Sequence, residues 1–258
     1  MNGETIMSIE VKNLSKTYKL KGGLTKTAVD NISFSIPSGE IVGFIGPNGA
    51  GKSTTIKMMT GILIPDHGFV SIDGRSFKKN RKEILMKTGV VFGQKSVLCW
   101  DIPVWDTLKL FKDMYRVPDI TYKRNMEMFS EILGIEEFIR QPPRLLSLGQ
   151  RMKADLAASL IYDPDILFLD EPTIGIDVLS KERIRNFIKK INEERHTTII
   201  LTTHDVSDIE TLCEKMIIID EGSLIYDGTL PELKATYQTT DLEEIIKRIY
   251  LAGERKNA

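Results

Sequence analysis

The sequence predicts an α/β fold, and three observations lead to this prediction. Short apolar runs typical of strands alternate with segments of helical periodicity. One such run, at residues 41–45, is followed by a glycine-rich loop and then by a helical segment. Another, at residues 166–169, is apolar on both faces, as a central parallel strand requires. The 258 residues suffice for one large α/β domain, or for a core with a smaller lobe.

The composition excludes several classes of function. The 35 basic and 36 acidic side chains leave a net charge of −1, which argues against nucleic acid as a partner. The two cysteines, Cys99 and Cys213, lack metal-ligand neighbours and indicate a reducing compartment. The N-terminus shows no signal-peptide pattern, and no apolar run approaches the ~18 residues of a membrane span. Any work at a membrane should therefore depend on another chain.

The N-terminal segment predicts an antiparallel β layer. Residues 8–18 alternate between apolar and polar side chains and form a strand that ends at Tyr18. The lysine- and glycine-rich residues 19–27 then form a hairpin connection. Strict alternation at residues 32–36 indicates the returning strand, which ends before the loop described next.

The glycine-rich loop has the spacing G-x-x-x-x-G-K-S of a phosphate-binding loop. Glycines allow backbone N–H groups to turn inward around an anion, and the helix that begins near Lys52 directs its positive dipole end to the same place. We expect Lys52 to reach the β- and γ-phosphates and the Ser53 hydroxyl to bind Mg²⁺. The phosphate loop, which predicts nucleoside triphosphate binding, comprises Gly46, Pro47, Asn48, Gly49, Ala50, Gly51, Lys52, Ser53 and Thr54.

The segments after the phosphate loop alternate in type. The expected elements are a helix ending at Gly61, a turn over 65–68 with a solvent-facing His67, a strand over 69–72, a surface helix within 75–88 and a strand over 89–94. From about residue 95 to residue 160 the pattern becomes helical, which predicts an inserted α-helical subdomain. Its start holds both tryptophans, Trp100 and Trp105. They form either a local core or an apolar patch for a partner.

The C-terminal half returns to alternating elements. After the strand at 166–169, the patterns predict a helix over 181–195, a strand over 197–201, a hairpin with strands at 216–219 and 224–226, and a helix over 240–253. The last helix should begin with a capping box of Thr240 and Glu243. We expect it to pack on its own domain.

Polar side chains follow three of the predicted strands. Asp170 and Glu171 end the apolar strand, where Asp170 can hold Mg²⁺ through water and Glu171 can act as general base. His204 and Gln94 end two other strands, and either can bond to the γ-phosphate region. Alone, His204 would be better explained as a satisfied loop residue. With the others it predicts a catalytic set of Glu171, His204 and Gln94, and a metal set of Ser53, Gln94 and Asp170.

The motifs occur in one order that resembles the nucleotide-binding domain of ATP-binding cassette (ABC) transporters. They are residues 46–54, Gln94, residues 146–150, residues 167–172, residues 175–177 and His204. The resemblance covers roughly residues 8–230. It implies a P-loop NTPase core with a parallel sheet, an antiparallel β subdomain and the helical subdomain at about 95–160. Residues 231–258 are then a C-terminal helical extension, and ATP and Mg²⁺ are the expected cofactors.

The resemblance also implies roles for individual residues. Tyr18 matches the aromatic that stacks on adenine, and Asp177 matches the residue that crosses the dimer interface. The signature motif, which contacts ATP bound to the other subunit, corresponds to Ser147, Leu148, Gly149 and Gln150. Ser147 and Gln150 have the spacing of a capping box. Leu148 replaces the glycine of the commonest signature, but its backbone N–H remains available.

A single cassette with no membrane span resembles a separate ATPase subunit. By this resemblance it acts at the cytoplasmic face of the cell membrane, as a homodimer or paired with a similar cassette, on an integral membrane permease. Residues 93–105 and 146–153 resemble the ABC-2 type exporter branch, whose members are often described as drug or antibiotic exporters. In that family the surface after Gln94 receives the coupling helix of the permease, which would make Leu98, Trp100 and Trp105 a docking patch.

Three alternatives stay open at this point. The first is the ATPase subunit of an importer, which the absence of an added domain after residue 230 mildly disfavours. The second is a soluble cassette that acts on ribosomes or DNA, which would need fused cassettes or long insertions. The third is a binding module without hydrolysis. The transported substrate is not encoded in these residues.

Overall fold

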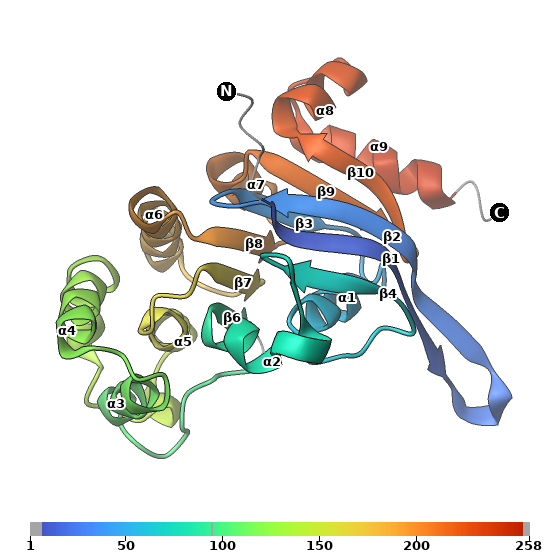
Figure 1. Cartoon of the computed structure of the whole chain (residues 1–258). Helices are drawn as coiled ribbons and strands as arrows, with labels where there is room; N and C mark the ends of the chain where they lie inside the picture. Colours follow the sequence, from blue (N-terminus) through green and yellow to red (C-terminus); the bar gives the residue numbers. More distant parts are fainter. Residues whose placement is uncertain (1–6, 94, 255–258) are drawn as a thin grey trace, which may run out of the picture.

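The computed structural model describes residues 7–93 and 95–254, with the backbone alone for Met7 and residues 252–254. The chain forms two sheets with helices around them (Figure 1). The strand order is β2-β1-β4-β5 in the smaller sheet and β10-β9-β3-β8-β7-β6 in the larger. The predicted α/β class is confirmed.

The smaller sheet is antiparallel, as the N-terminal alternation predicts. Its strands are β1 (Met7–Lys19), β2 (Thr25–Pro37), β4 (His67–Ile72) and β5 (Arg75–Ser76), and a 3-10 turn at Lys21–Gly23 joins the first two. The expected turn over 65–68 is partly wrong, because His67 pairs with Ser15 and already belongs to β4. Its side chain faces solvent, as expected.

The larger sheet is parallel except for its edge strand. Its strands are β3 (Ile41–Ile45), β6 (Thr88–Phe92), β7 (Ile166–Asp170), β8 (Thr198–Thr202), β9 (Lys215–Asp220) and β10 (Ser223–Thr229), the last antiparallel to β9. Every residue of β3 and β8 is buried, which agrees with their central places. Strand β6 ends at Phe92, two residues before the predicted end, and Gln94 itself lies outside the described residues.

Most of the predicted helices are present, with some shifted ends. The helices are α1 (Lys52–Met59), α2 (Phe77–Met86), α3 (Val104–Met114), α4 (Asp119–Met128), α5 (Leu148–Leu160), α6 (Val178–Arg195), α7 (Val206–Leu212), α8 (Leu230–Tyr237) and α9 (Leu242–Glu254). Short turns of π- or 3-10-helix lie at Phe129–Leu133, Ile135–Glu137 and Pro143–Leu145. Helices α3, α4 and α5 gather at one end of the molecule (Figure 1).

Helix α9 begins at Leu242, and its capping residue lies one position later than predicted. The carboxylate of Asp241 accepts a hydrogen bond from the N–H of Glu244 at 3.1 Å, so Asp241 caps the helix. The predicted capping box of Thr240 and Glu243 is therefore wrong. The apolar face of α9 is buried on its own domain, as expected, through side chains such as Leu242 and Ile245.

Two apolar cores lie on opposite faces of the larger sheet. Because side chains alternate along a strand, Val42 and Phe44 belong to the core shared with the smaller sheet and α1. Ile41 and Ile45 belong to the second core, which contains the buried faces of α5, α6 and α9. This packing holds the carboxyl ends of β3, β6, β7 and β8 at one edge of the sheet, next to the N-terminus of α1.

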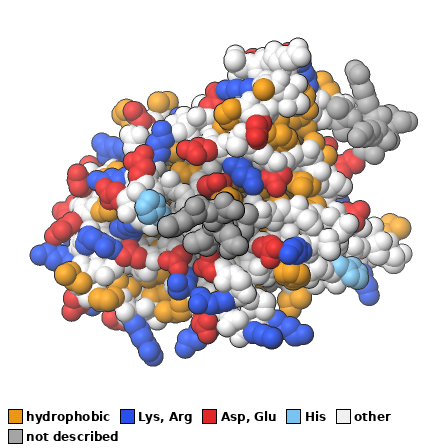
Figure 2. Space-filling view, turned by 45° about the horizontal axis from the view of Figure 1, so that its top comes forward, with side chains coloured by type: hydrophobic (Ala, Val, Ile, Leu, Met, Phe, Trp, Pro, Cys, Tyr) orange, Lys and Arg blue, Asp and Glu red, His pale blue; other side chains and the backbone are white. Residues whose placement is uncertain are grey.

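The described surface carries mixed charges. Lys and Arg side chains are interspersed with Asp and Glu over the face drawn in Figure 2, without a continuous basic area among the residues described there. Within the described ranges, no helix combines the length and apolar character that crossing a membrane requires.

Candidate functional site

The phosphate loop connects β3 to α1, and two of its glycines have distinct tasks. Gly51 has φ of 103°, and a Cβ at this position would lie 2.3 Å from the carbonyl oxygen of Ala28. Gly49 also has positive φ, 86°, but no atom lies within 4 Å of the place its Cβ would take. Gly51 thus permits both the backbone turn and the close approach of a neighbouring strand, whereas Gly49 permits the turn alone.

Lys52 folds back beneath the phosphate loop. Its ammonium donates hydrogen bonds to the carbonyl oxygens of Gly46 at 2.6 Å and Pro47 at 3.0 Å. Burial lowers the pKa of Lys52, and the nearby carboxylates of Glu171 and Asp170 act in the opposite direction. A cation is therefore held at the loop, where a phosphate would lie against it.

A cavity of about 300 Å³ opens on the outer side of the loop. Its lining includes Tyr18, which lies opposite Lys26 in the β1–β2 hairpin. Tyr18 is 37% exposed, so the ring is accessible to a planar ligand. The same cavity is lined by Lys52, Ser53 and Thr54, which brings the predicted ring-stacking residue and the predicted phosphate contacts to one site.

The neighbouring cavity, of about 430 Å³, brings Ser53 together with Asp170 and Glu171. One oxygen of Asp170 accepts a hydrogen bond from Thr202 Oγ1 at 2.7 Å. Among the described residues, no cluster of three or more His, Cys, Asp or Glu side chains could hold a metal by itself. One hydroxyl and one carboxylate suit Mg²⁺ that arrives with a triphosphate, since this ion takes few protein ligands and fills its shell with phosphate oxygens and water.

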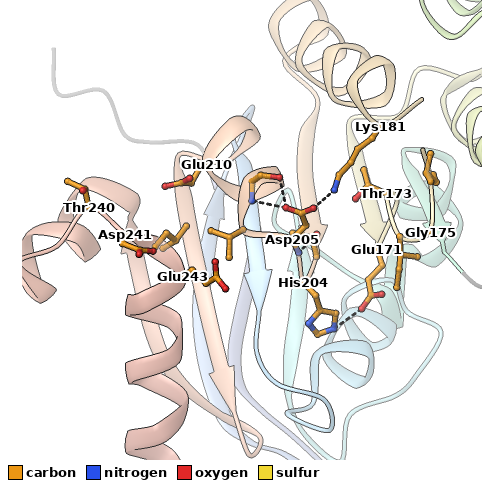
Figure 3. Close-up of a pocket in the computed structure, with 16 residues that line it drawn as sticks. Glu171, Thr173, Gly175, Lys181, His204, Asp205, Glu210, Thr240, Asp241 and Glu243 are labelled. Carbon is orange, nitrogen blue, oxygen red and sulfur yellow. Dashed lines mark hydrogen bonds and ion pairs between the residues drawn. The ribbon is translucent and has the colours of Figure 1, made fainter. Parts of the chain in front are cut away.

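Glu171 and His204 face each other across the ends of β7 and β8. The Nε2 atom of His204 lies 2.9 Å from Oε1 of Glu171 (Figure 3). Glu171 has φ of 54°, in the left-handed region that a glutamate rarely adopts. Its N–H bonds to both the carbonyl and the hydroxyl of Thr202, each at 3.0 Å. The predicted pair is therefore assembled, and its third predicted member, Gln94, lies outside the described residues.

The signature residues form the N-terminus of α5, with both hydrogen bonds of the capping box. Ser147 Oγ accepts from the N–H of Gln150 at 3.2 Å, and Gln150 Oε1 accepts from the N–H of Ser147 at 3.0 Å. Gly149 is buried against α6, where a Cβ would lie 3.2 Å from Ser180 Oγ. Leu148 lies next to Gly175, since a Cβ added at Gly175 would be 3.1 Å from Leu148 Cδ2. None of these four residues lines the loop cavities, so a single chain does not bring the signature to its own phosphate loop.

Asp177 has a local role besides the interface role that the family resemblance implies. Its carboxylate caps α6 by accepting a hydrogen bond from the N–H of Ser180 at 2.9 Å, and this bond lowers the pKa of Asp177. The residue is exposed, and so are Ile174, Val178 and Leu179 beside it. An apolar surface of this kind next to the signature helix is typical of an interface.

A larger cavity, of about 820 Å³, lies on the other side of Glu171 and His204 (Figure 3). It extends between the turn after β7, helix α7 and the start of α9, and Glu210, Asp241 and Glu243 contribute to its lining. These carboxylates disfavour a phosphate ligand. Burial raises the pKa of Asp205, but hydrogen bonds from Lys181 and Ser207 outweigh it and lower the value to about 2.

The region of the two tryptophans divides between core and surface. Leu98 is 7% exposed and belongs to the apolar core, so it is wrong to include it in a docking patch. Trp105 is half-buried and packs against Tyr122, with Arg140 over its ring at 4.9 Å. Trp100 and Ile102 are exposed and remain as surface candidates.

Residues 29–174, more than half of the chain, match the family described as ABC transporter. The chain belongs to this family. It is 32% identical over 245 residues to the ABC transporter ATP-binding protein NatA of Bacillus subtilis, covering 95% of this chain and 99% of NatA. It is 35% identical to the Nod factor export ATP-binding protein I of Ralstonia nicotianae (87% and 68%). The methionine import ATP-binding protein MetN 3 of Shouchella clausii is 29% identical (97% and 74%).

One similar solved structure is of a cassette that has hydrolysed ATP. The dimeric ATP-binding cassette MJ0796, in a post-hydrolysis state with ADP and Pi, is 28% identical with a TM-score of 0.76, covering 86% of this chain and 98% of that one. The ABC protein described here is thus an ATP-binding ATPase with the expected fold.

Proposed function

We propose that this ABC ATPase powers export through a separate membrane subunit, and that Glu171 and His204 carry its hydrolytic step. The observation that supports this most directly is their contact of 2.9 Å at the edge of the cavity that also contains Ser53 and Asp170. Four strand ends and one helix N-terminus meet there. This is the place where ligands bind in open α/β sheets.

Each residue has a role that its chemistry allows. Tyr18 would stack on the base, the N–H groups of residues 46–54 and the ammonium of Lys52 would bind the phosphates, and Ser53 and Asp170 would hold Mg²⁺. When bound, Mg²⁺ would neutralise charge on the phosphates. Glu171 orients and deprotonates the attacking water, and His204 holds Glu171 in place through Nε2. Gln94 is assigned to the same group by its motif alone.

The site is completed by a second cassette. The N-terminal N–H groups of α5, with Ser147, Leu148, Gly149 and Gln150, then bind the γ-phosphate held by the other copy. Asp177 crosses the interface, and the exposed Ile174, Val178 and Leu179 are buried there. Two copies of this chain, or this chain with a similar cassette, would satisfy the same arrangement.

Export places the chain at the cytoplasmic face of a membrane, bound to a permease that contacts the cargo. The relative named for Nod factor export supports this direction, and the one named for methionine import makes an importer the alternative. A drug, antibiotic, peptide or lipid-like compound is the cargo class that the branch resemblance favours. We assign the docking surface to the exposed Trp100 and Ile102, together with the half-buried Trp105.

The hydrolytic site is tested by ATP turnover of the purified chain. We expect Glu171→Gln and Lys52→Ala each to reduce kcat by about a hundredfold or more, because one removes the general base and the other a phosphate contact. Lys79→Ala, on the exposed side of α2, is the matched control and should retain wild-type turnover. Unchanged turnover in both site variants would show that the active site lies elsewhere.

Direction and partner are tested together by affinity purification of tagged Glu171→Gln protein from native membranes with ATP. A membrane protein recovered without an extracellular binding protein would support export, whereas recovery with such a protein would support import. Trp100→Ala should lose the membrane protein and keep ATP turnover. Retained co-purification would remove Trp100 from the docking surface.

A further inference from the structure

Asp208, in helix α7, is a buried carboxylate that joins the two turns carrying Glu171 and His204. Its side chain is 0% exposed. The Oδ2 atom accepts hydrogen bonds from the hydroxyls of Thr173 at 2.5 Å and Thr203 at 2.9 Å. Both threonines are themselves 5% exposed, so water does not replace these contacts readily.

The two threonines are adjacent to the proposed catalytic pair in sequence. Thr173 lies two residues after Glu171, in the turn that follows β7, and Thr203 immediately precedes His204 at the end of β8. One carboxylate oxygen therefore connects the backbone that carries the base to the backbone that carries the histidine. Figure 3 shows the segments that carry Glu171 and His204 side by side, with the contact between these two side chains drawn as a dashed line.

The other oxygen of Asp208 is held by helix α6. Arg185 donates to Oδ1 from Nε at 2.6 Å and is also paired with it through Nη2, while Lys181 Nζ lies 3.8 Å away. Arg185 further donates to Ser207 Oγ at 2.6 Å. A buried carboxylate requires compensation of this kind, and the paired guanidinium also fixes the orientation of the carboxylate plane.

The conformation of Glu171 makes such support necessary. A left-handed residue directly before a proline combines two unfavourable conditions, and backbone conformations of this kind persist only when the surroundings impose them. The bonds from the N–H of Glu171 to Thr202 fix one side of the turn. The bond from Thr173 to Asp208 fixes the other.

We propose that Asp208 is a positioning residue for ATP hydrolysis, setting the separation of Glu171 and His204 through Thr173 and Thr203 while Arg185 holds it in place. This inference rests on the proposed roles of Glu171 and His204. It differs from a purely structural ion pair, because a structural role changes the fraction of folded protein and leaves the rate per folded molecule unchanged.

Substitutions at the two threonines test the positioning role of Asp208. Valine keeps the shape of threonine but removes the hydroxyl, whereas serine keeps the hydroxyl. We expect Thr203→Val and Thr173→Val to reduce kcat by roughly tenfold or more, because small misplacements of reacting groups cost large factors in rate. KM for ATP should change less than about twofold, since neither threonine lines the phosphate-loop cavity. Thr203→Ser and Thr173→Ser keep the hydroxyl and should restore the rate.

The matched control alters an ion pair on the same helix. Glu210 in α7 pairs with Lys234 at 2.8 Å, with no contact to the threonines, and Glu210→Gln should keep wild-type kcat. Asp208→Asn should resemble the valine variants in rate. Its melting temperature should also fall, because Arg185 then loses its buried partner.

A double-variant cycle decides between positioning and a general loss of structure. In the His204→Ala background, whose slow turnover is measured by release of labelled phosphate, adding Thr203→Val should cause no further loss. Wild-type kcat in both valine variants, or an equal loss in both backgrounds, would overturn the inference. Wild-type kcat in Glu171→Gln would instead overturn the proposed catalytic site, so the two failures are distinguishable.

Discussion

Gly49 and Gly51 lie two residues apart in the phosphate loop, and the difference between their surroundings has a measurable consequence. Alanine at either position costs about 1 kcal/mol through its left-handed conformation. Only at position 51 would the added Cβ also meet a backbone carbonyl, at 2.3 Å. We expect Gly51→Ala to lose a further ~1–3 kcal/mol of stability.

Chemical denaturation measures the stability of Gly49→Ala and Gly51→Ala, and nucleotide titration measures their affinity for ATP. Gly51→Ala should also lose most of its ATP affinity, since the strand at Ala28 and the loop must move apart. Gly49→Ala should bind ATP more weakly than the wild type but retain its stability more closely. Equal unfolding free energies for the two variants would contradict the assigned role of the Ala28 contact.

For single residues, the sequence predicts contacts between neighbours along the chain, but it does not predict contacts between residues that only the fold brings together. The Ser147–Gln150 box depends on fixed spacing along the chain, and the structure forms both of its hydrogen bonds. The spacing of the phosphate loop likewise predicts a lysine at the loop, where Lys52 bonds to the carbonyl of Gly46. Asp208 depends on hydroxyls 35 and 5 residues away, and nothing in a threonine or an aspartate indicates such a contact in advance. The assignment of Leu98 to a docking patch is wrong for the same reason, because its burial in the apolar core depends on tertiary packing.

Among the helices, α5 begins with a cap that also serves the proposed contact with the partner's ATP, and two substitutions separate these roles. Ser147→Ala removes the cap and should lower the unfolding free energy by about 1 kcal/mol. Ser147→Asp keeps a capping oxygen but adds a negative charge where a phosphate would bind. It should retain stability within about 0.5 kcal/mol and lose ATP-dependent association.

Denaturation and analytical ultracentrifugation with ATP distinguish the two effects. Thr229→Ala, which removes the threonine hydroxyl that caps α8, is a suitable control for cap loss without loss of association. If Ser147→Asp still associated with ATP, the signature residues of this chain would not contact phosphate.

Asp155 connects α5 to the segment that follows Gln94, and it makes stability depend on pH. Its Oδ1 accepts hydrogen bonds from Ser96 Oγ and the N–H of Val97, each at 2.8 Å. Burial raises the pKa of Asp155 from 3.8 to about 6, against the opposing effect of these bonds. The folded chain therefore binds this proton more tightly than the unfolded chain does. The contribution to stability is complete below pH 3.8 and is lost as the pH rises through about 6.

The corresponding prediction concerns Asp155→Asn, which does not titrate. Between about pH 4 and about pH 7, the wild type should lose ~1–3 kcal/mol relative to this variant. Urea denaturation across that range measures the difference. Asp165→Asn, an exposed partner of Lys87, is the control and should follow the wild type. A constant difference between wild type and Asp155→Asn would mean that Asp155 does not titrate in this window.

The sequence predicted strands better than short helices. Runs such as 41–45 and 166–169 are apolar throughout, because both faces of a central strand are buried. Helix α7 has only seven residues, too few to establish a period, and the predicted C-terminal helical extension does not resolve α8 as a separate helix. The cap of α9 differs from the prediction because Thr239, Thr240 and Asp241 all suit a cap, and tertiary packing selects among them.

For the whole molecule, the exposed apolar side chains near Asp177 predict how two copies associate. Val178 is 80% exposed, next to the signature helix. Ile120 is 81% exposed on α4, at the far end of the helical region (Figure 1). In the Glu171→Gln background with ATP, Val178→Lys should abolish dimer formation, and Ile120→Lys should leave it intact, because only the first buries a charge at the proposed interface.

Sedimentation in the presence and absence of ATP checks this comparison. Dimerisation of the Val178→Lys protein would place the interface on another surface. A dimer already present without ATP would contradict the nucleotide-dependent pairing.

The separation between the phosphate loop and the signature helix has a genetic consequence. On the proposed pairing, each complete site takes its loop from one copy and its helix N-terminus from the other. A copy carrying Lys52→Ala still offers a normal helix N-terminus, so it enters pairs with wild-type copies and leaves each such pair with one defective site. In a cell that expresses both alleles equally, half of the pairs would be mixed. The mutation should therefore behave as partly dominant, whereas an allele that prevents pairing should be recessive.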